Sequence, residues 1–468
     1  MVEATAEGGG VFGHFENGQF VEGYTGVPTA YKSPDTPGVV TLRFKVDDDG
    51  NLANDEPTVV EIKITVWDFT ITDCPTDWLP EFDKSLDFEL EIAPAVDHNG
   101  NSLASIINCT LNSSQEPGIC NNKLRAEEQF QWDLQFLNPQ NDFNVTSSSN
   151  EPYKNDKATT KQATTHAKLT VKCYDFGAYG TLTATAYIPN VGMRSARVKG
   201  NPGKFVVEIP IDEDNNFIAD NWESEKGHQP TEDNETVPQS NQSGDGISRY
   251  EEYRGFIIDS GGEEVHIRTD PTIKDVFIKD ESNLGAGYFT DLGLKIRWNP
   301  LTDDYNLVTR YHSGDKKSEH VDGQYAVRML EREYDMGTPD PMVVVDDGFI
   351  LGACGNYPRG DTKMYKSASL NEPDVTTFIY SKRIEWWASF YWNENPEYYK
   401  QKYGIDNLED LVQIGINKVI AHELGHAVNL SHCSQTSCIM VQGLPYKEGI
   451  PTSYCPETKN EVKLYKER

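Results

Sequence analysis

The chain of 468 residues is too long for one ordinary hydrophobic core, so we expect two or three domains. Its net charge of −32 would repel phosphate, which argues against a nucleic-acid partner. No stretch approaches the roughly 20 apolar residues that a membrane span needs. No secretory signal is visible at the small, polar N-terminus, and we expect a secreted protein whose signal has been removed.

The first 210 residues carry the pattern of β-structure. Residues 1–36 are rich in Gly, Pro and Thr and predict an extended leader or a loosely attached edge strand. From residue 37 onward, β-branched residues alternate with polar ones, as in half-buried strands. The predicted strands are 39–46, 59–66, 86–92, 168–173, 180–187 and 204–209, and the polar stretch 93–165 predicts long loops. Short strands separated by turns favour an all-β, immunoglobulin-like sandwich over 37–210.

An acidic linker, 211–254, follows and contains two candidate calcium loops. Oxygen-bearing side chains recur there at the ligand positions of a twelve-residue EF-hand loop, in which position 7 offers its backbone carbonyl. These residues are Asp212, Asp214, Asn216, Ile218, Asp220 and Glu223 in the first loop, and Asn241, Ser243, Asp245, Ile247 and Glu252 in the second.

The two loops differ at the sharp turn that such a loop requires. Gly246 fits the turn position of the second loop, whereas Phe217 occupies it in the first. The segment resembles acidic calcium-loop modules of extracellular bacterial proteins, which implies bound Ca²⁺ and supports secretion. The competing interpretation is a solvated acidic linker.

The remaining chain, 255–468, predicts a mixed α/β domain. Apolar runs predict strands at 276–278, 292–298, 341–345, 349–351 and 376–380. Apolar residues predict a helix over 322–334, and aromatic-rich turns predict helices over 384–390 and 397–403. We expect the aromatic residues of the last two helices to pack beneath the helix that follows them.

The most informative stretch begins in that following helix. Apolar residues at helical spacing predict a helix from about 406 to 430, started by an Asp or Asn cap. His422 and His426 lie four residues apart and project from one face, so both imidazoles can reach one zinc ion. Glu423 is rotated away from the metal and is suited to act as a general base that takes a proton from water.

The chain beyond the helix supplies a third candidate ligand. Asn429 tolerates a left-handed backbone and predicts the helix end. The chain can then turn and bring His432 to the metal. Three protein ligands leave a fourth position open, which is typical of catalytic rather than structural zinc. The competing interpretation is a surface helix with three unrelated histidines.

This stretch resembles the metzincin family of zinc endopeptidases, whose signature is H-E-x-x-H-x-x-G-x-x-H followed by a Met-containing turn. The family position of glycine is Asn429 here. The resemblance implies a small α/β catalytic unit with a mixed sheet, whose edge strand pairs with the substrate backbone. The stretch 376–380 is the candidate for that strand. Residue by residue, it implies zinc ligands His422, His426 and His432, the general base Glu423, and Met440 beneath the metal.

The cysteines allow two interpretations. The chain has eight, an even number in turn-rich contexts, which favours disulfides in an oxidising compartment. Neighbouring candidates are Cys109 with Cys120, and Cys433 with Cys438. Cys433, Cys438 and Met440 also have archaemetzincin-like spacing. That branch completes a second zinc site with a later C-x-x-C, of which only Cys455 is present here. A second metal site at the last three cysteines is therefore the competing interpretation.

These observations predict a secreted, monomeric zinc-dependent endopeptidase with catalytic Zn²⁺ and structural Ca²⁺. Residues after Met440, such as 442–446, would set its cleavage preference. The main alternative is a calcium-stabilised extracellular binding or adhesion protein with a structural or vestigial zinc site, although a structural site has no need of Glu423. An intracellular aminopeptidase-like zincin is disfavoured because the third ligand is His432 rather than a downstream Glu.

Overall fold

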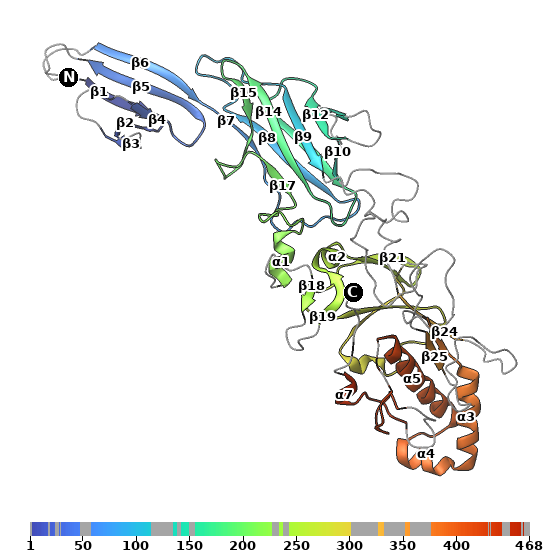
Figure 1. Ribbon diagram of the computed structural model, residues 1–468. Helices are drawn as coiled ribbons and strands as arrows, with labels where there is room; N and C mark the ends of the chain where they lie inside the picture. Colours follow the sequence, from blue (N-terminus) through green and yellow to red (C-terminus); the bar gives the residue numbers. More distant parts are fainter. Residues whose placement is uncertain are drawn as a thin grey trace, which may run out of the picture. The chain divides into compact units, whose positions relative to one another are not determined.

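The chain is a multidomain, mixed α/β protein rich in β-sheet, as predicted. The computed structural model describes residues 2–16, 19–23, 28, 30–46, 58–113, 134–137, 142–148, 155–226, 234–236, 243–300, 326–331, 352–355, 376–428, 430, 432–441, 450–459 and 462. The chain divides into two compact units, one formed by Met1–Glu116 with Gln129–Glu213 and the other including Asp214–Arg468. Figure 1 shows sheets throughout and the longest helices near the C-terminus. Within the described segments, no helix is long and apolar enough to cross a membrane.

Two small antiparallel sheets form the beginning of the first unit. One has the order β1-β5-β6 and consists of β1 (Val2–Glu7), β5 (Gly38–Val46) and β6 (Thr58–Val66). The other has the order β3-β2-β4 and consists of β2 (Val11–Glu16), β3 (Gln19–Glu22) and β4 (Ala30–Lys32). Residues 1–36 thus supply an edge strand and three further strands rather than an extended leader. Pairing of β1 with β5 satisfies backbone groups that a free leader would leave to water.

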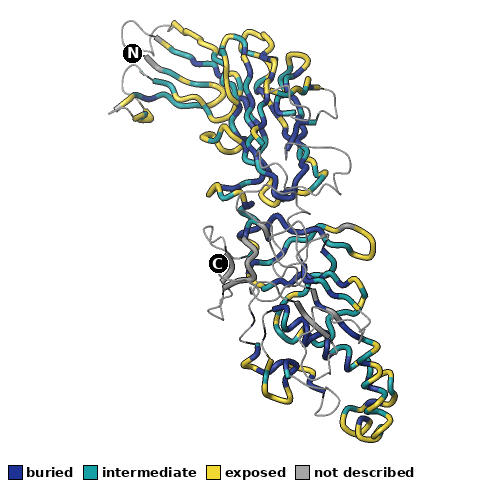
Figure 2. Tube along the Cα trace, turned by 45° about the vertical axis from the view of Figure 1, so that its right-hand side comes forward, coloured by how far each residue is buried: buried dark blue, intermediate teal, exposed yellow. Residues whose placement is uncertain are grey.

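Two larger sheets in the same unit share one apolar core. The first, in the order β10-β13-β8-β7-β16, contains β7 (Asp68–Ile71), β8 (Ser85–Ala93), β10 (Leu134–Leu137), β13 (His166–Cys173) and β16 (Arg197–Val198). The second, in the order β11-β12-β9-β14-β15 with β17 also on β14, contains β9 (Ile107–Ser113), β11 (Phe143–Thr146), β12 (Lys157–Thr160), β14 (Gly180–Ile188), β15 (Gly192–Ser195) and β17 (Val207–Ile209). Buried residues from both, such as Phe88 and Leu182, belong to one cluster, and Figure 2 shows buried stretches of chain within this unit.

The prediction of long loops over 93–165 is wrong in part, because this stretch contains β9, β10, β11 and β12. In β9, buried Ile107, Cys109 and Leu111 alternate with polar residues that face outward. Such a short alternation is easily hidden among Ser and Asn runs. The predicted strand 204–209 is shorter than expected and begins at Val207. The predicted strands 39–46 and 59–66 form as β5 and β6, but they belong to the smaller sheet.

The second unit opens with short elements. These are α1 (Asp220–Lys226), β18 (Asn234–Thr236), β19 (Ser243–Ser248), α2 (Arg249–Arg254), β20 (Phe256–Ser260) and β21 (Glu263–Ile267). β18 pairs with β19, and β20 pairs with β21, each pair antiparallel.

A five-stranded sheet with the order β23-β22-β24-β26-β25 forms the centre of the second unit. Its strands are β22 (Asp275–Asp280), β23 (Lys295–Trp298), β24 (Val327–Glu331), β25 (Gly352–Gly355) and β26 (Thr376–Ile379). Four strands are parallel, and only β25 runs antiparallel, on β26. The predicted strands 276–278, 292–298 and 376–380 are confirmed in β22, β23 and β26, although Phe289–Leu292 forms the 3-10 helix η1 just before β23.

Two predictions about this sheet are corrected. The stretch predicted as a helix over 322–334 contains strand β24, whose Val327 and Met329 are fully buried between parallel neighbours. The buried residues alternate with Arg328 and Leu330, which are only half-buried, but this alternation is too short to exclude a helix from the sequence. The strand β26 is interior rather than at the edge, which is formed by β25. The predicted strands 341–345 and 349–351 lie outside the described residues.

Helices near the C-terminus complete the second unit. They are α3 (Ser381–Glu394), α4 (Pro396–Tyr403), α5 (Leu408–Ala427) and the short α7 (Pro456–Lys459), which confirms the predicted helices 384–390, 397–403 and most of 406–430. Helix α5 contacts α3, η1, β25 and β26. Its residues Val419, Ile420 and Leu424 join Ile278 and Met329 of the sheet in one buried cluster.

Candidate metal centre

Helix α5 carries the candidate site on its last turns. The helix starts at Asn407, whose side-chain oxygen accepts a hydrogen bond from the Asp410 backbone N–H at 2.9 Å. This is the cap expected near position 406, and it satisfies one of the free N–H groups of the first turn. Buried apolar residues then hold the helix against the sheet. The packed helix fixes the positions of His422, Glu423 and His426.

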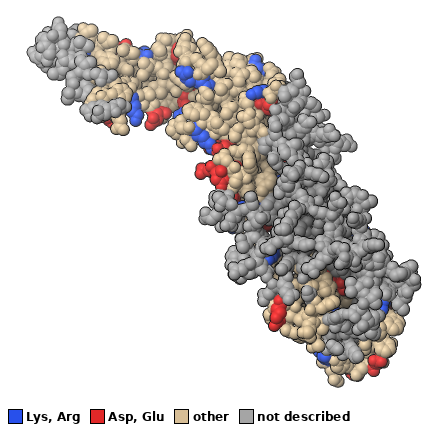
Figure 3. Space-filling view, viewed as in Figure 1, with Lys and Arg blue, Asp and Glu red and all other residues tan. Residues whose placement is uncertain are grey.

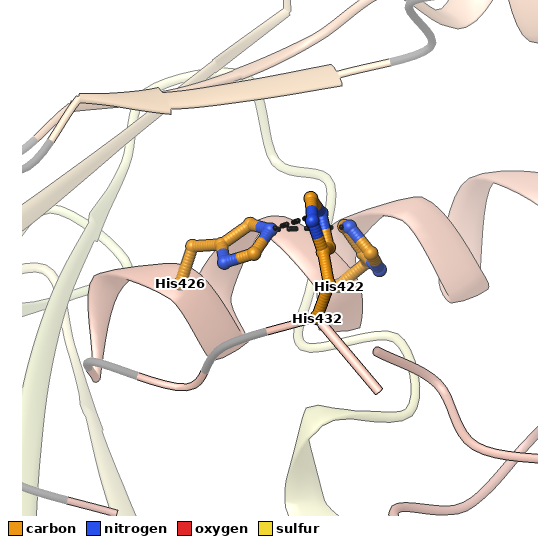
Figure 4. A group of neighbouring side chains, drawn as sticks. All are labelled: His422, His426 and His432. Atoms are coloured by element: carbon orange, nitrogen blue, oxygen red, sulfur yellow. Dashed lines mark hydrogen bonds between the residues drawn. The ribbon is translucent and has the colours of Figure 1, made fainter. Parts of the chain in front are cut away.

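The three predicted histidines meet at one point. The Nε2 atom of His426 lies 3.2 Å from Nε2 of His422 and 3.1 Å from Nε2 of His432. Figure 4 shows the three rings turned toward one another, two from the helix and one from the chain beyond it. His422 is buried and His426 partly buried, whereas His432 is exposed, so the cluster is open on one side.

Backbone carbonyls fix the tautomers of the two helical histidines. Nδ1 of His422 lies 2.8 Å from the Ile439 carbonyl oxygen, and Nδ1 of His426 lies 2.8 Å from that of Leu430. A carbonyl oxygen only accepts, so each Nδ1 must carry the proton. In the neutral rings both Nε2 atoms then present lone pairs to each other. This arrangement fits a cation held between them, and zinc accepts such imidazole nitrogens.

Burial keeps the same two rings neutral. It lowers the pKa of His426 to about 4, against the weaker opposing effect of the hydrogen bond to Leu430. It also lowers the pKa of His422 well below its usual value, and positive charge on Lys418 adds to the effect. Neutral imidazole is the form that binds metal, so the residues fit a zinc ion near neutral pH.

Glu423 lies in the same turn and is also buried, with 7% of its surface exposed. Burial raises the pKa of its carboxyl group to about 8, and the Lys418 ammonium acts in the opposite direction. Burial lowers the pKa of Lys418 itself to about 8, while the negative charges of Glu423 and Cys438 raise it. A divalent cation near Glu423 would add to the effect of Lys418 and favour the carboxylate.

Met440, the residue that the resemblance places beneath the metal, packs directly against helix α5. Met440 is fully buried, and a Cβ atom at Gly425 would lie only 2.5 Å from its Sδ. Gly425 is therefore needed between the two helical histidines for this close contact. The Tyr454 hydroxyl donates to the Ala421 carbonyl at 2.5 Å on the same part of the helix. Asn429, the predicted helix stop, lies outside the described residues, and the helix ends at Ala427 with Val428 as its cap.

Three cysteines gather beside the histidine cluster. The Sγ atoms of Cys433, Cys438 and Cys455 all lie within 4.8 Å of one another. The Thr458 hydroxyl approaches the Cys455 sulfur at 2.9 Å and the Cys438 sulfur at 3.5 Å. The predicted Cys433–Cys438 disulfide is absent, since both are free thiols, and Cys433 Sγ lies 3.3 Å from Cys455 Sγ instead. Hydrogen bonds, that from Thr458 foremost, lower the pKa of Cys438 against the effect of burial, which suits a thiolate ligand. Cys109 is also free, and Cys120 lies outside the described residues.

The first candidate calcium loop brings acidic groups together. Carboxylate oxygens of Asp212, Asp214 and Asp220 lie within 4.8 Å of one another. The side-chain amide of Asn216 donates to Asp214 at 3.1 Å and to Glu223 at 3.0 Å. At the turn position, Phe217 has a φ of +69°, so the chain makes the sharp turn without glycine.

The last candidate ligand of each candidate calcium loop makes other contacts. Glu223 is buried and forms an ion pair with Arg249 at 3.6 Å, so a cation would have to compete with this guanidinium. Glu252 is fully buried on α2 and accepts a hydrogen bond from the Thr269 hydroxyl at 3.2 Å. Ser243, Asp245 and Ile247 lie in strand β19, paired with β18, where the pattern predicted a loop. Asn241 lies outside the described residues, as do the predicted specificity residues 442–446.

Sequence reasoning missed two residues of the centre. Lys418 was assigned no role from the sequence, although it is 4% exposed and lies one turn before His422. Gly425 was part of the motif H-E-x-x-H but carried no assigned role. Gly425 matters because it lets Met440, fifteen residues later in the chain, approach the helix closely. A local sequence pattern does not reveal such a contact.

Charged side chains elsewhere on the described surface are mixed in sign. On the face shown in Figure 3, acidic and basic side chains of described residues are interspersed. Several form exposed pairs, such as Lys168 with Asp87 at 2.8 Å and Lys400 with Glu397 at 2.9 Å.

No protein-family model matches the chain, and no curated protein matches it. The resemblance to metzincins therefore depends on the motif and on the geometry of the residues that form it.

Proposed function

We propose that this protein is a secreted zinc-dependent endopeptidase of the metzincin type. His422, His426 and His432 would hold the zinc ion, and Glu423 would act as the general base. The observation that carries the proposal is that the three Nε2 atoms converge within hydrogen-bond distance. In His422 and His426 the ring proton lies on Nδ1, which donates to a backbone carbonyl, so Nε2 is free to bind a metal.

The placement of Glu423 supports a catalytic rather than a structural role. When bound, zinc would supply Lewis acidity that favours ionisation of water and polarises a carbonyl group. Glu423 would not be a zinc ligand itself, because it is rotated away from the two helical histidines. Its carboxylate can take a proton from the attacking water and return it to the leaving amine. Exposure of His432 leaves room for substrate beside the three ligands.

The edge strand β25 is the candidate element for binding the substrate backbone. It is antiparallel to β26 and forms one margin of the sheet, and it contacts α5. By the resemblance, an edge strand in this position would pair with an extended substrate backbone. We therefore assign this role to Gly352–Gly355 instead of 376–380. Main-chain pairing recognises extended peptide of many sequences, which suits an endopeptidase.

The test is hydrolysis of unfolded casein by wild type and by Glu423→Gln, at matched zinc occupancy. Glutamine keeps the size of the side chain and removes the base. We expect the rate to fall at least about a hundredfold, the usual contribution of a general base. A matched control is Glu409→Gln, on the exposed first turn of the same helix, which should leave the rate unchanged.

Retention of most activity by Glu423→Gln would contradict the assigned base. If neither protein cleaves casein although zinc is bound, the alternative moves forward, namely a calcium-stabilised extracellular binding protein with a structural zinc site. Both hypotheses include secretion and calcium binding at Asp212, Asp214 and Asp220. The clustering of these three carboxylates supports the calcium site. A second metal at Cys433, Cys438 and Cys455 is likewise proposed as structural, with Thr458 beside it.

A further inference from the structure

Strand β6 leaves an open edge in the N-terminal sheet. Among the described strands only β5 pairs with it, in unbroken register from Gly38↔Val66 to Val46↔Thr58. Apolar side chains on this strand are unusually exposed: Val59 by 50%, Val60 by 44% and Ile62 by 46%. Val60 and Ile62 lie on the same face as buried Val40 and Leu42, so the apolar face of the sheet continues to its open edge.

Edges of this kind are normally blunted. Short length, charged side chains (lysine above all), proline, bulges or inward-pointing charges keep edge strands from pairing with other chains. Strand β1, at the opposite edge, is shorter and contains Glu3 and Glu7. Strand β6 has nine residues, no proline and no bulge. Its charged residues, Glu61 and Lys63, lie on the face opposite Val60 and Ile62. Glu61 and Lys63 are thus the only protective feature of this edge, and a strand that neutralised them could pair with it.

The charge pattern of β6 identifies that strand. The sequence Val60-Glu61-Ile62-Lys63-Ile64 is complementary to itself when it runs antiparallel about Ile62. Glu61 then faces Lys63 of the second copy on one surface, and Val60 faces Ile64 on the other. We propose that β6 pairs with β6 of a second copy of this chain, forming a six-stranded sheet across a two-fold axis. A symmetric contact of this kind is self-limiting.

Electrostatics selects one register. A shift of the symmetric pairing by two residues places Glu61 opposite Glu61, or Lys63 opposite Lys63. Like charges directly opposite each other are destabilising, whereas the register about Ile62 creates two attractive pairs. Lys63 has no ion-pair partner among the described residues, and Glu61 binds Arg43 through Oε1 at 2.6 Å. Thr65 already contacts His98 at the end of the strand, so the pairing runs over Val60–Ile64.

The experiment is sedimentation velocity of the full chain at concentrations up to about 100 µM, well into the range of weak self-association. Wild type should dimerise. Lys63→Glu replaces both attractive pairs by repulsive ones and should raise Kd about tenfold or more. Glu61→Lys should do the same. Mixed in equal amounts, the two variants restore opposite charges across the interface and should form a heterodimer.

Lys32→Glu on β4 is the matched control, because it makes the same change of net charge on an exposed residue of the other small sheet. It should dimerise as wild type does. Circular dichroism confirms that each variant is folded. The inference is overturned if wild type stays monomeric throughout, if Lys63→Glu associates as strongly as wild type, or if the mixture remains monomeric. Wild-type dimerisation would also replace the expectation of a monomer made from the sequence.

Discussion

His422 and His426 show how burial keeps an imidazole ring neutral. A histidine in water is half protonated near pH 6.5, and a protonated ring cannot bind zinc. In this protein burial lowers the pKa of His426 to about 4, so the ring stays neutral in mildly acidic solution. In the zinc-free protein this burial lowers the free energy of unfolding below about pH 6.5, because the folded state holds neutral a ring that would be protonated in water.

That cost predicts a pH dependence of stability. The folded pKa of His426 is lower than the unfolded value, so the unfolded chain binds more protons between about pH 6.5 and 4. Zinc-free wild type should therefore lose stability as the pH falls through this window. His426→Gln should lose less, as measured by urea denaturation at each pH. Parallel curves for the two proteins would contradict the assignment of the lowered pKa to His426.

Gly425 predicts a second effect at the scale of one residue. A methyl group there would meet Met440 Sδ at 2.5 Å, so Gly425→Ala must displace a buried side chain. We expect a loss of about 1–3 kcal/mol in the free energy of unfolding, despite the better helix propensity of alanine. Denaturant unfolding measures it. A double-mutant cycle with Met440→Ala should show coupling, and additive effects would show that the contact is unimportant.

At this scale the sequence was most informative where ligands are close in the chain. The eleven residues from His422 to His432 contain all three histidines and the proposed base Glu423, because one helix and one turn suffice to bring them together. Lys418 and Gly425 could not be assigned, since their roles depend on Met440, Cys438 and the packing of distant elements.

Among the helices and strands, α5 begins at a capping residue that is recognisable in the sequence. Asn407 caps it, as Asn395 caps α4 through a hydrogen bond from the Tyr398 N–H at 3.1 Å. Asn407→Ala should cost about 1 kcal/mol of stability, while Asn407→Ser should retain most of it. Thermal unfolding measures both. Zinc content should stay the same, because the ligands lie at the other end of the helix. A loss of zinc with Asn407→Ala would mean that the helix is not rigid enough to separate the two ends.

The strands of the second unit show why sequence reasoning failed there. β24 contains Val327, Met329 and Leu330 in a run with no clear period, which also fits a helix. Its identity as a strand comes from β22 and β26, which flank it on both sides. The prediction that 376–380 forms the edge strand failed for the same reason, because the position of β25 beside β26 depends on pairing between separate segments. Neighbours in a parallel sheet are supplied by segments far apart in the chain.

At the scale of the whole molecule, the division into two units predicts separate responses to metal. All three histidines belong to the unit that includes Asp214–Arg468. A ligand stabilises only the structure that binds it. Removal of zinc with 1,10-phenanthroline should lower one calorimetric transition and leave the other unchanged. The variant His426→Gln should show the lowered transition without chelator. A shift of both transitions by the same amount would contradict independent units.

The order of elements along the chain has a consequence for synthesis. Helix α5 covers a sheet whose strands β22, β24 and β26 precede it, and the chain is made from the N-terminus. A growing chain that has reached β26 therefore carries the apolar residues Ile278 and Met329 without their cover. Incomplete chains of this length would be prone to aggregate on the ribosome. Under the proposed function, the same delay would keep a newly made chain unable to cut its neighbours until the stretch from His422 to His432 has been synthesised.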